Sequence, residues 1–307
     1  MNTPIHPTAA TVAPGASDVP PVGGAGAIGG TGGAGAPGAC QRWHDRRPSW
    51  RHVRDGGFDR HRYQVAPIDE ADAKRFIQRH HYAGTMPAAL RRYGMLERDT
   101  QHLVGVAVFA VPVNTTVLTR PFPDLEPHRQ SMELSRFCLL DQVPGNGESW
   151  FLGQAFRLLH ADGVRGIVSF SDPVPRWHLD GTVIMPGHVG IIYQATGAVY
   201  AGRGTARTLL LLPDGTSLNA RSLQKVRALD QGHAYVERRL VAAGAPARPP
   251  TADPAVWLAD ALRAARVRRV RHGGAHRYLF RLGSARERRT IRIGLPSVDT
   301  YPKLPDT

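Results

Sequence analysis

Apolar residues along this chain occur in short uninterrupted runs, separated by polar and glycine-rich segments. Three of these runs have the length of buried strands: Leu103–Val111, Met132–Leu140 and Gly166–Phe170. The segments Ala71–His80 and Trp150–His160 instead place apolar side chains at helical spacing, and both predict helices. Strands and helices that alternate in this way predict a mixed α/β sheet flanked by helices, in one domain of about 150 residues.

Weaker patterns predict further elements in the second half of the chain. They are strands at Val189–Gln194 and Ala198–Tyr200, a hairpin over Thr208–Leu218, a helix over Ala255–Arg269, and strands at Tyr278–Leu282 and Thr290–Ile293. Asp253 followed by Pro254 supplies the cap and the first position of that helix. We interpret the last two strands as a basic C-terminal β-hairpin.

Composition divides the chain into four parts. Residues 1–40 hold 10 Gly, 9 Ala and 6 Pro, and predict a disordered tail, because such a segment buries too little apolar surface to offset its ordering entropy. Residues 41–64 are a basic, aromatic arm that lies either on the domain or on a polyanion. Residues 65–245 form the sheet domain, and residues 246–307 form a basic extension of one helix and the hairpin.

Several classes of protein are not expected from this composition. No run of about 18 apolar residues occurs, so a transmembrane helix is not predicted. The first residues lack the basic and apolar regions of a secretion signal. Cys40 and Cys138 are too few for a disulfide framework or a four-thiolate zinc site. We therefore expect a cytoplasmic protein with no membrane partner.

Positive charge is concentrated near the C-terminus. The 307 residues carry 39 Lys+Arg and 25 Asp+Glu, a net charge of +14. Twelve basic and two acidic side chains lie between Arg263 and Lys303, so this short segment carries +10. This distribution favours a polyanionic partner, most simply DNA, although genome composition also enriches arginine. The side chains assigned to DNA phosphates are Arg281, Arg286, Arg288, Arg289 and Arg292.

A glycine-rich turn, residues 144–149, joins a predicted strand to a predicted helix. Backbone N–H groups of Gly145, Asn146 and Gly147, together with the Ser149 hydroxyl, lie at the helix N-terminus, where a phosphate binds favourably. The turn is therefore a candidate site for a phosphorylated small-molecule donor. The alternative is an ordinary tight connection.

Alternation along the strand 132–140 places Glu133, Ser135 and Phe137 on one face and Arg136 on the other. An arginine among apolar neighbours needs an anionic partner. Arg136 therefore either binds a phosphate or carboxylate of a ligand, or forms a structural ion pair with an acid such as Asp172.

Asp172 follows the third strand, at the edge where open α/β sheets bind ligands. It is either a general base or the first residue of an Asx turn before a proline. His188 and Tyr193 follow in a glycine-rich segment, and each can donate or accept a hydrogen bond. One of the adjacent histidines at 80–81 can join His188 and Asp172 in a metal centre, but the sequence does not fix the distances, so the metal stays unknown.

Five segments, in this order, resemble the phage Mom family of DNA adenine-modification proteins. They are residues 80–84 (HHYAG), 133–137 (ELSRF), 145–149 (GNGES), 169–173 (SFSDP) and 187–195 (GHVGIIYQA), with weaker similarity at 274–280 and 301–303. The resemblance implies a GNAT-like fold and the conversion of adenine N6 in DNA to a methylcarbamoyl (acetamido-type) derivative, which protects phage or mobile DNA from restriction. It points to Arg136, Asp172 and Tyr193 as catalytic positions, and more weakly to Tyr82 and Ser149.

In such a reaction Asp172 would accept the N6 proton, Tyr193 would donate to a developing oxyanion, and Arg136 would hold a phosphate or carboxylate. The donor is not fixed by the sequence; acetyl-CoA and other CoA thioesters are candidates. The chain departs from the family pattern by an insert at residues 173–186, with a predicted hairpin turn at Asp180-Gly181. Two other functions stay open: an acyl-CoA-dependent N-acyltransferase acting on a protein or small molecule, and a non-catalytic DNA-binding protein.

Overall fold

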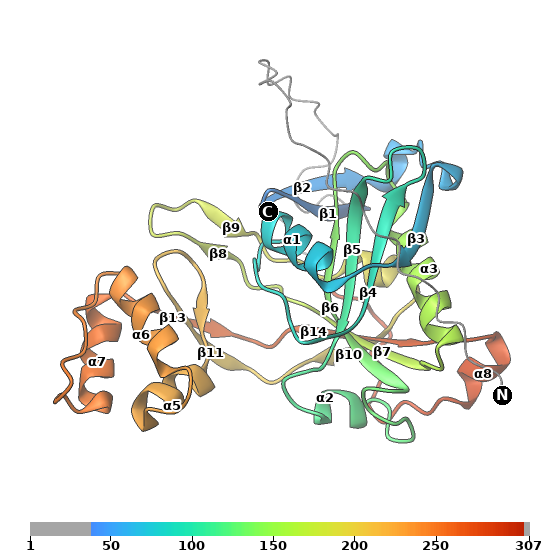
Figure 1. Cartoon of the computed structure of the whole chain (residues 1–307). Coiled ribbons are helices and arrows are strands. Elements are labelled where there is room, and N and C mark those ends of the chain that lie inside the picture. Colours follow the sequence, from blue (N-terminus) through green and yellow to red (C-terminus); the bar gives the residue numbers. More distant parts are fainter. Residues whose placement is uncertain (1–37, 304–307) are drawn as a thin grey trace, which may run out of the picture. The chain divides into compact units, whose positions relative to one another are not determined.

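The computed structural model describes residues 38–303, which form two compact units (Figure 1). Unit 1 comprises the residues up to 171, residues 188–202 and the residues from 276 onward, while unit 2 comprises residues 172–187 and 203–275. These boundaries do not coincide with the composition change near residue 246. The predicted tail, residues 1–40, falls almost entirely outside the described residues.

Unit 1 is built on a seven-stranded mixed sheet in the order β10-β14-β7-β6-β5-β4-β3. The strands are β3 (Tyr63–Pro67), β4 (Ala89–Glu97), β5 (Leu103–Ala110), β6 (Ser131–Leu139), β7 (Gly166–Ser171), β10 (Val199–Arg203) and β14 (His276–Arg281). β6 and β7 run parallel, whereas β3 to β6 pair antiparallel in sequence and β14 pairs antiparallel with β7. The predicted mixed sheet and its three central apolar strands are confirmed.

Helices flank this sheet. They are α1 (Glu70–His80), α2 (Thr116–Thr119), α3 (Gly147–Ala161), α4 (Ile191–Ala195) and α8 (Ala285–Thr290). The predicted first helix is confirmed, and it begins where the Asp69 side chain accepts a hydrogen bond from the N–H of Asp72 at 2.8 Å. The helix expected over Trp150–His160 is also confirmed, but it begins earlier, at Gly147.

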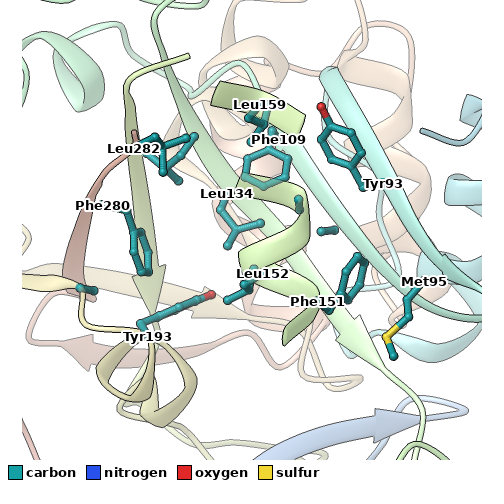
Figure 2. Packing of buried hydrophobic residues seen from close by; sticks show 14 of the residues in the cluster. Tyr93, Met95, Phe109, Leu134, Phe151, Leu152, Leu159, Tyr193, Phe280 and Leu282 are labelled. Atoms are coloured by element: carbon teal, nitrogen blue, oxygen red, sulfur yellow. The ribbon is translucent and has the colours of Figure 1, made fainter. Parts of the chain in front are cut away.

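The main core of unit 1 lies between the sheet and α3 (Figure 2). Phe151 and Leu152 of α3 pack with Phe109 of β5 and Leu134 of β6, and all four side chains are buried. Burial of this apolar surface is the main favourable contribution to folding. It also fixes β6 against α3, and thereby positions the polar residues that follow Leu134.

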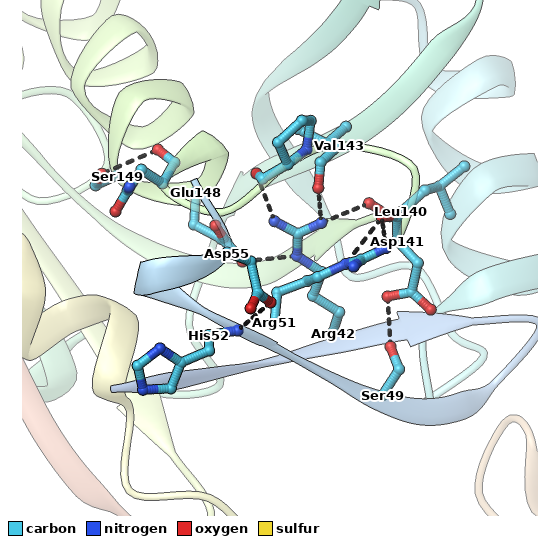
Figure 3. A network of polar contacts seen from close by, with 12 residues as sticks. Arg42, Ser49, Arg51, His52, Asp55, Leu140, Asp141, Val143, Glu148 and Ser149 are labelled. Carbon is cyan, nitrogen blue, oxygen red and sulfur yellow. Dashed lines mark hydrogen bonds and ion pairs between the residues drawn. The ribbon is translucent and has the colours of Figure 1, made fainter. Parts of the chain in front are cut away.

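The basic segment before β3 forms a hairpin of β1 (Ala39–His44) and β2 (Arg47–His52), followed by 3-10 turns at Val53–Asp55 and Arg60–Arg62. Its side chains bind the segment that leads from β6 into α3 (Figure 3). Ser49 donates to the Asp141 carboxylate at 2.5 Å, and Arg51 donates to the Asp141 carbonyl at 2.8 Å. Of the two predicted alternatives, this segment therefore lies on the domain.

Arg42 anchors that hairpin from inside the protein. Its side chain is almost fully buried, and its Nε donates to the Glu148 carboxylate at 2.7 Å. The guanidinium also donates to the carbonyl oxygens of Leu140, Val143 and Pro144 (Figure 3). This positive charge is neutralised within the fold and is not presented to a polyanion.

The strand predicted at Val189–Gln194 is wrong, because the chain turns there and enters α4. Gly190 adopts a φ of 74°, and a Cβ at this position would lie 2.8 Å from ring atoms of Tyr193 and Tyr278. Only glycine permits this turn, and the apolar residues after it form a helix.

The predicted C-terminal hairpin is also wrong. β14 pairs with β7 inside the large sheet, and the short helix α8, capped by Ser284 and Glu287, replaces the strand expected at Thr290–Ile293. The reciprocal hydrogen bonds of Ser284 and Glu287, and Arg288 and Arg289 in the last turn near the negative end of the helix dipole, favour this helix over a second strand.

Unit 2 contains a three-stranded sheet, a short hairpin and three helices. Its elements are β8 (Arg176–Trp177), β9 (Val183–Met185), β11 (Arg207–Leu211), β12 (Ser217–Leu218), β13 (Arg268–His272), α5 (Ala220–Ala228), α6 (His233–Ala242) and α7 (Pro254–Ala264). The hairpins predicted at 208–218 and around Asp180-Gly181 are confirmed. Helix α7 is shorter than predicted, because residues 268–272 pair with β11 instead.

Candidate functional site

A β-bulge in β6 sets the geometry of the candidate site. Val108 of β5 pairs with Arg136, but the next residue, Phe109, pairs with Leu134, so Ser135 is an extra residue on β6. The bulge shifts the alternation, and Leu134 and Phe137 both pack into the core against α3. Glu133 and Arg136, predicted on opposite faces, interact electrostatically and share the other face. That prediction assumed an uninterrupted strand.

Arg136 is held by the segment that follows α1. Its Nε donates to the Thr85 carbonyl at 3.0 Å, its Nη2 to the Thr85 hydroxyl at 3.2 Å, and its Nη1 to the Ser135 carbonyl at 2.7 Å. Burial lowers the pKa of Arg136, while the nearby Tyr82 and Glu133 oppose this change. The three hydrogen bonds fix the orientation of a guanidinium that stays charged.

Two aromatic residues from the start of that segment lie beside Arg136. His81 is buried, and burial together with the charges of Arg136 and His188 holds its pKa well below the usual value. Its Nδ1 accepts a hydrogen bond from the Ala83 N–H at 3.1 Å, so His81 is a neutral ring. The rings of His81 and Tyr82 lie 4.3 Å apart. Tyr82, a weaker prediction, thus belongs to the same group as Arg136.

Tyr193 enters this group from α4. The parallel ladder of β6 and β7 ends at the pair Leu134 and Ser169, and the Tyr193 hydroxyl interacts with Ser169 at that point. Tyr193 is buried, and burial raises its pKa to about 12. Its phenol therefore keeps its proton at neutral pH and is available as a hydrogen-bond donor.

Glu133 supplies the carboxylate of the group, although strand alternation predicted it on the face opposite Arg136. Burial raises the pKa of Glu133, partly offset by a hydrogen bond from the Ser135 hydroxyl at 2.9 Å and by Arg136. A half-buried carboxylate with a raised pKa suits a general base better than a solvated one. Sequence reasoning missed Glu133 because the bulge that brings it to the side of Arg136 is set by pairing with β5, and the pattern of β6 alone does not indicate it.

Asp172 lies in unit 2, where its carboxylate has several partners. It accepts hydrogen bonds from the Val174 N–H at 3.0 Å, from Arg176 and from His272 Nε2 at 2.9 Å. His272 is fully buried, and its Nδ1 accepts from the Gly274 N–H, so both ring nitrogens are occupied. The Asx turn predicted as one alternative is present, and the hydrogen bond from His272 links Asp172 to β13 within unit 2.

Close packing requires glycine at two positions of the glycine-rich turn. A Cβ at Gly145 would lie 2.8 Å from the His52 carbonyl, and one at Gly147 would lie 2.6 Å from the Val143 side chain. Asn146 is exposed and adopts a φ of 75°, and the Ser149 hydroxyl donates to its carbonyl at 3.1 Å. A pocket of about 610 Å³ adjoins the turn, lined by Asn146, Ser149, Trp150, Phe58, Asp59, Arg60 and His61.

The arginines predicted to bind DNA fall into two classes. Arg286, Arg288 and Arg289 are exposed on α8, whereas Arg292 donates two hydrogen bonds to Asp124, at 2.8 and 2.9 Å. A second pocket of about 730 Å³ lies at the end of α3 and β14, and its basic lining comprises Arg157, His160, Arg281 and Arg288.

Two further features considered in the sequence analysis are a metal centre and a membrane-spanning helix. Among residues 38–303, no set of three or more His, Cys, Asp or Glu side chains is arranged to hold a metal ion. Within the same range, no helix is both long enough and apolar enough to cross a membrane.

Comparison with known proteins gives one family. The profile of the Mom protein family matches residues 62–303, which is more than half of the chain. A search of curated proteins finds no significant match.

The solved structures that match include two acetyltransferases and a tandem GNAT protein. Ribosomal-protein-S5-alanine acetyltransferase from Vibrio fischeri has a TM-score of 0.32 and 15% identity, over 49% of this chain and 87% of that one. Spermidine N-acetyltransferase from Vibrio cholerae has a TM-score of 0.30 and 12% identity, over 47% and 83%. A tandem GNAT protein from the clavulanic acid biosynthesis pathway has a TM-score of 0.31 and 11% identity, over 69% and 72%. These scores are too low to indicate a substrate or donor.

Proposed function

Because the chain belongs to the Mom protein family, we propose that it is a transferase that attaches a methylcarbamoyl (acetamido-type) group to adenine N6 in DNA. The observation that supports this most directly is the group formed by Tyr82, Glu133, Arg136 and Tyr193 where β6 and β7 separate. It combines a carboxylate, a fixed cation and a buried phenol, which are the elements that transfer to a weak nucleophile requires.

Adenine N6 needs a base because its lone pair is delocalised into the ring. We propose that Glu133 takes the N6 proton as the new bond from N6 to the donor carbon forms and the donor's leaving group departs. Tyr193 donates a hydrogen bond to the charge that develops on the donor, and Arg136 orients an anionic part of the substrate or donor. Tyr82 packs against the tilted rings of Trp43 and His81 and lies within electrostatic reach of Arg136.

The donor is proposed to bind at the turn 145–149. The pocket beside Asn146 and Ser149 is also lined by Arg60, whose positive charge suits a phosphorylated donor such as acetyl-CoA or another CoA thioester, and by His61, whose ring can form a hydrogen bond with it. The buried contact of Arg42 with Glu148 holds this turn in place from below.

Mass spectrometry of nucleosides tests the proposal directly. DNA from cells that express the wild-type chain should contain a new adenosine derivative, which should be missing when Arg136→Met is expressed at equal level. An acetylated protein or polyamine without any modified adenosine would favour the alternative N-acyltransferase. DNA binding without any modified nucleoside would favour a non-catalytic DNA-binding protein.

The pH dependence of the reaction should report Glu133. Burial raises the pKa of this carboxyl above that of an ordinary glutamate, and the base works only when ionised. The modification rate should therefore fall as the pH drops through this raised pKa, and should stay level towards neutral pH, where Tyr193 keeps its proton. Rates measured on one oligonucleotide between about pH 5 and pH 9 check this, because that range covers the titration of a glutamate with a raised pKa. A rate that rises as the pH falls would contradict it.

Salt dependence should separate the two classes of arginine. Arg288→Ala removes an exposed cation that lines the basic pocket, and should weaken DNA binding uniformly and reduce the slope of log affinity against log salt by about 1. Arg292→Ala removes the same charge from a side chain already paired with Asp124, and should change the slope much less. Equal slopes for the wild type and Arg288→Ala would remove this pocket from the DNA interface. Fluorescence anisotropy across a salt series provides the measurement.

A further inference from the structure

The insert at residues 173–186 forms a hairpin with one apolar face. β8 and β9 pair antiparallel, with Trp177 opposite Val183, and Leu179 lies in the turn that connects them. Exposed fractions are 39% for Trp177, 48% for Leu179 and 43% for Val183. Three large apolar side chains are thus exposed within seven residues, near the tip of one hairpin. They form a contiguous apolar patch, whereas apolar side chains scattered singly over a surface do not.

Several contacts hold this hairpin against the turn between β11 and β12 and against β13 of unit 2. The Ile184 side chain packs directly on Gly215, in the turn between β11 and β12, where any Cβ would collide with it. The Leu179 N–H donates to the Pro213 carbonyl at 3.2 Å, and Arg268 donates to the Trp177 carbonyl. The opposite face of the hairpin is thereby used for anchoring.

Charge around the hairpin favours a polyanion. Unit 2 carries fourteen basic and seven acidic side chains. Arg268, which contacts the hairpin, begins β13, and the exposed Arg207 lies on the same face of the paired strand β11. The exposed Arg269 and Arg271 of β13 lie on the opposite face of this pair. The acidic Asp180 and Asp214 lie near the tips, but each accepts hydrogen bonds from its own turn, at 2.8 and 2.9 Å.

We infer that this hairpin is a wedge that inserts its exposed apolar side chains, Trp177, Leu179 and Val183, between base pairs of duplex DNA, while Arg207 and Arg268, on the side of unit 2 that carries the hairpin, contact the backbone. This inference rests on the proposed function, because adenine N6 is paired and stacked in a duplex and must be exposed before it reacts. Apolar side chains inserted at a base step unstack it, and backbone contacts offset that cost. The wedge would thus make duplex DNA a substrate.

A duplex carrying 2-aminopurine beside a target adenine tests the wedge. This base gains fluorescence when it is unstacked, whether or not any group is transferred. We expect the wild-type protein to raise the fluorescence, and the triple variant Trp177→Ser, Leu179→Ser, Val183→Thr to reduce that rise by about fivefold or more, with duplex affinity reduced by less than about threefold. Because all three side chains are exposed, the variant should fold normally.

A matched control removes as many exposed apolar groups from the same unit: Tyr235→Ser, Val241→Thr and Val256→Ser on α6 and α7. It should leave the fluorescence rise unchanged. Modification of a single-stranded oligonucleotide should survive in the wedge variant, whereas modification of duplex should fall. Equal fluorescence from the wild type and the wedge variant, or no rise with the wild type, would overturn the inference. Absence of modification on both substrates with a normal fluorescence rise would overturn only the proposed function.

Discussion

Glu133→Gln is expected to lower the rate of adenine modification by at least about 100-fold, with little change in stability or DNA binding. The amide keeps the shape of the side chain and can still accept the hydrogen bond from Ser135, but it cannot take a proton. The measurement is the initial rate on a single-stranded oligonucleotide, followed by mass spectrometry. A single-stranded substrate separates the chemical step from any effect on the duplex.

The informative comparison is Asp172→Asn, because Asp172 is the base that the family resemblance implies. Its carboxylate already accepts hydrogen bonds from Val174, Arg176 and His272, so we expect its main effect on the stability of unit 2. A loss of rate in Asp172→Asn with unchanged thermal unfolding, beside a nearly normal Glu133→Gln, would assign the base to Asp172 and contradict our proposal. Ser135→Ala serves as a milder control, since it removes only one hydrogen bond from Glu133.

The sequence pattern was sufficient for the centre of the fold. β5, β6 and β7 are apolar runs buried in the sheet, and α1 and α3 carry a regular apolar face, so local pattern and tertiary packing agree there. Agreement ended where tertiary contacts decide the conformation. Gly190 starts a helix in an apolar run because two tyrosine rings leave no room for a side chain, and no local pattern contains that information.

The sequence named three residues of the proposed site but did not predict how they are arranged. Arg136, Tyr82 and Tyr193 come together in unit 1, as a shared site requires. Glu133 was placed on the wrong face because one extra residue in β6 reverses the alternation, and a bulge depends on how the neighbouring strand pairs. The arginine total was misleading in the same way, since charge counts do not distinguish a buried cation from an exposed one.

A substitution of Arg42 measures the difference between a buried and an exposed arginine. Arg42→Ala is expected to lower the free energy of unfolding by about 3–5 kcal/mol, because it leaves the buried Glu148 carboxylate without its partner. It also removes the donor to the Leu140, Val143 and Pro144 carbonyls. Urea denaturation followed by circular dichroism gives the value. The exposed pair of Arg91 and Asp162 is the control, and Arg91→Ala should cost less than about 1 kcal/mol.

A double variant separates the ion pair from the remaining contacts of Arg42. Arg42→Met with Glu148→Leu removes both buried charges, so it should recover most of the stability lost in Arg42→Ala, although the three carbonyls stay unpaired. If the double variant is no more stable than Arg42→Ala, those carbonyls, and not Glu148, are the reason for the arginine. Because Glu148 lies in the turn 145–149, where we propose that the donor binds, a folded double variant should require more donor for half-maximal rate while its affinity for DNA stays unchanged. A loss of DNA affinity instead would indicate that Arg42 supports DNA binding, which its burial does not predict.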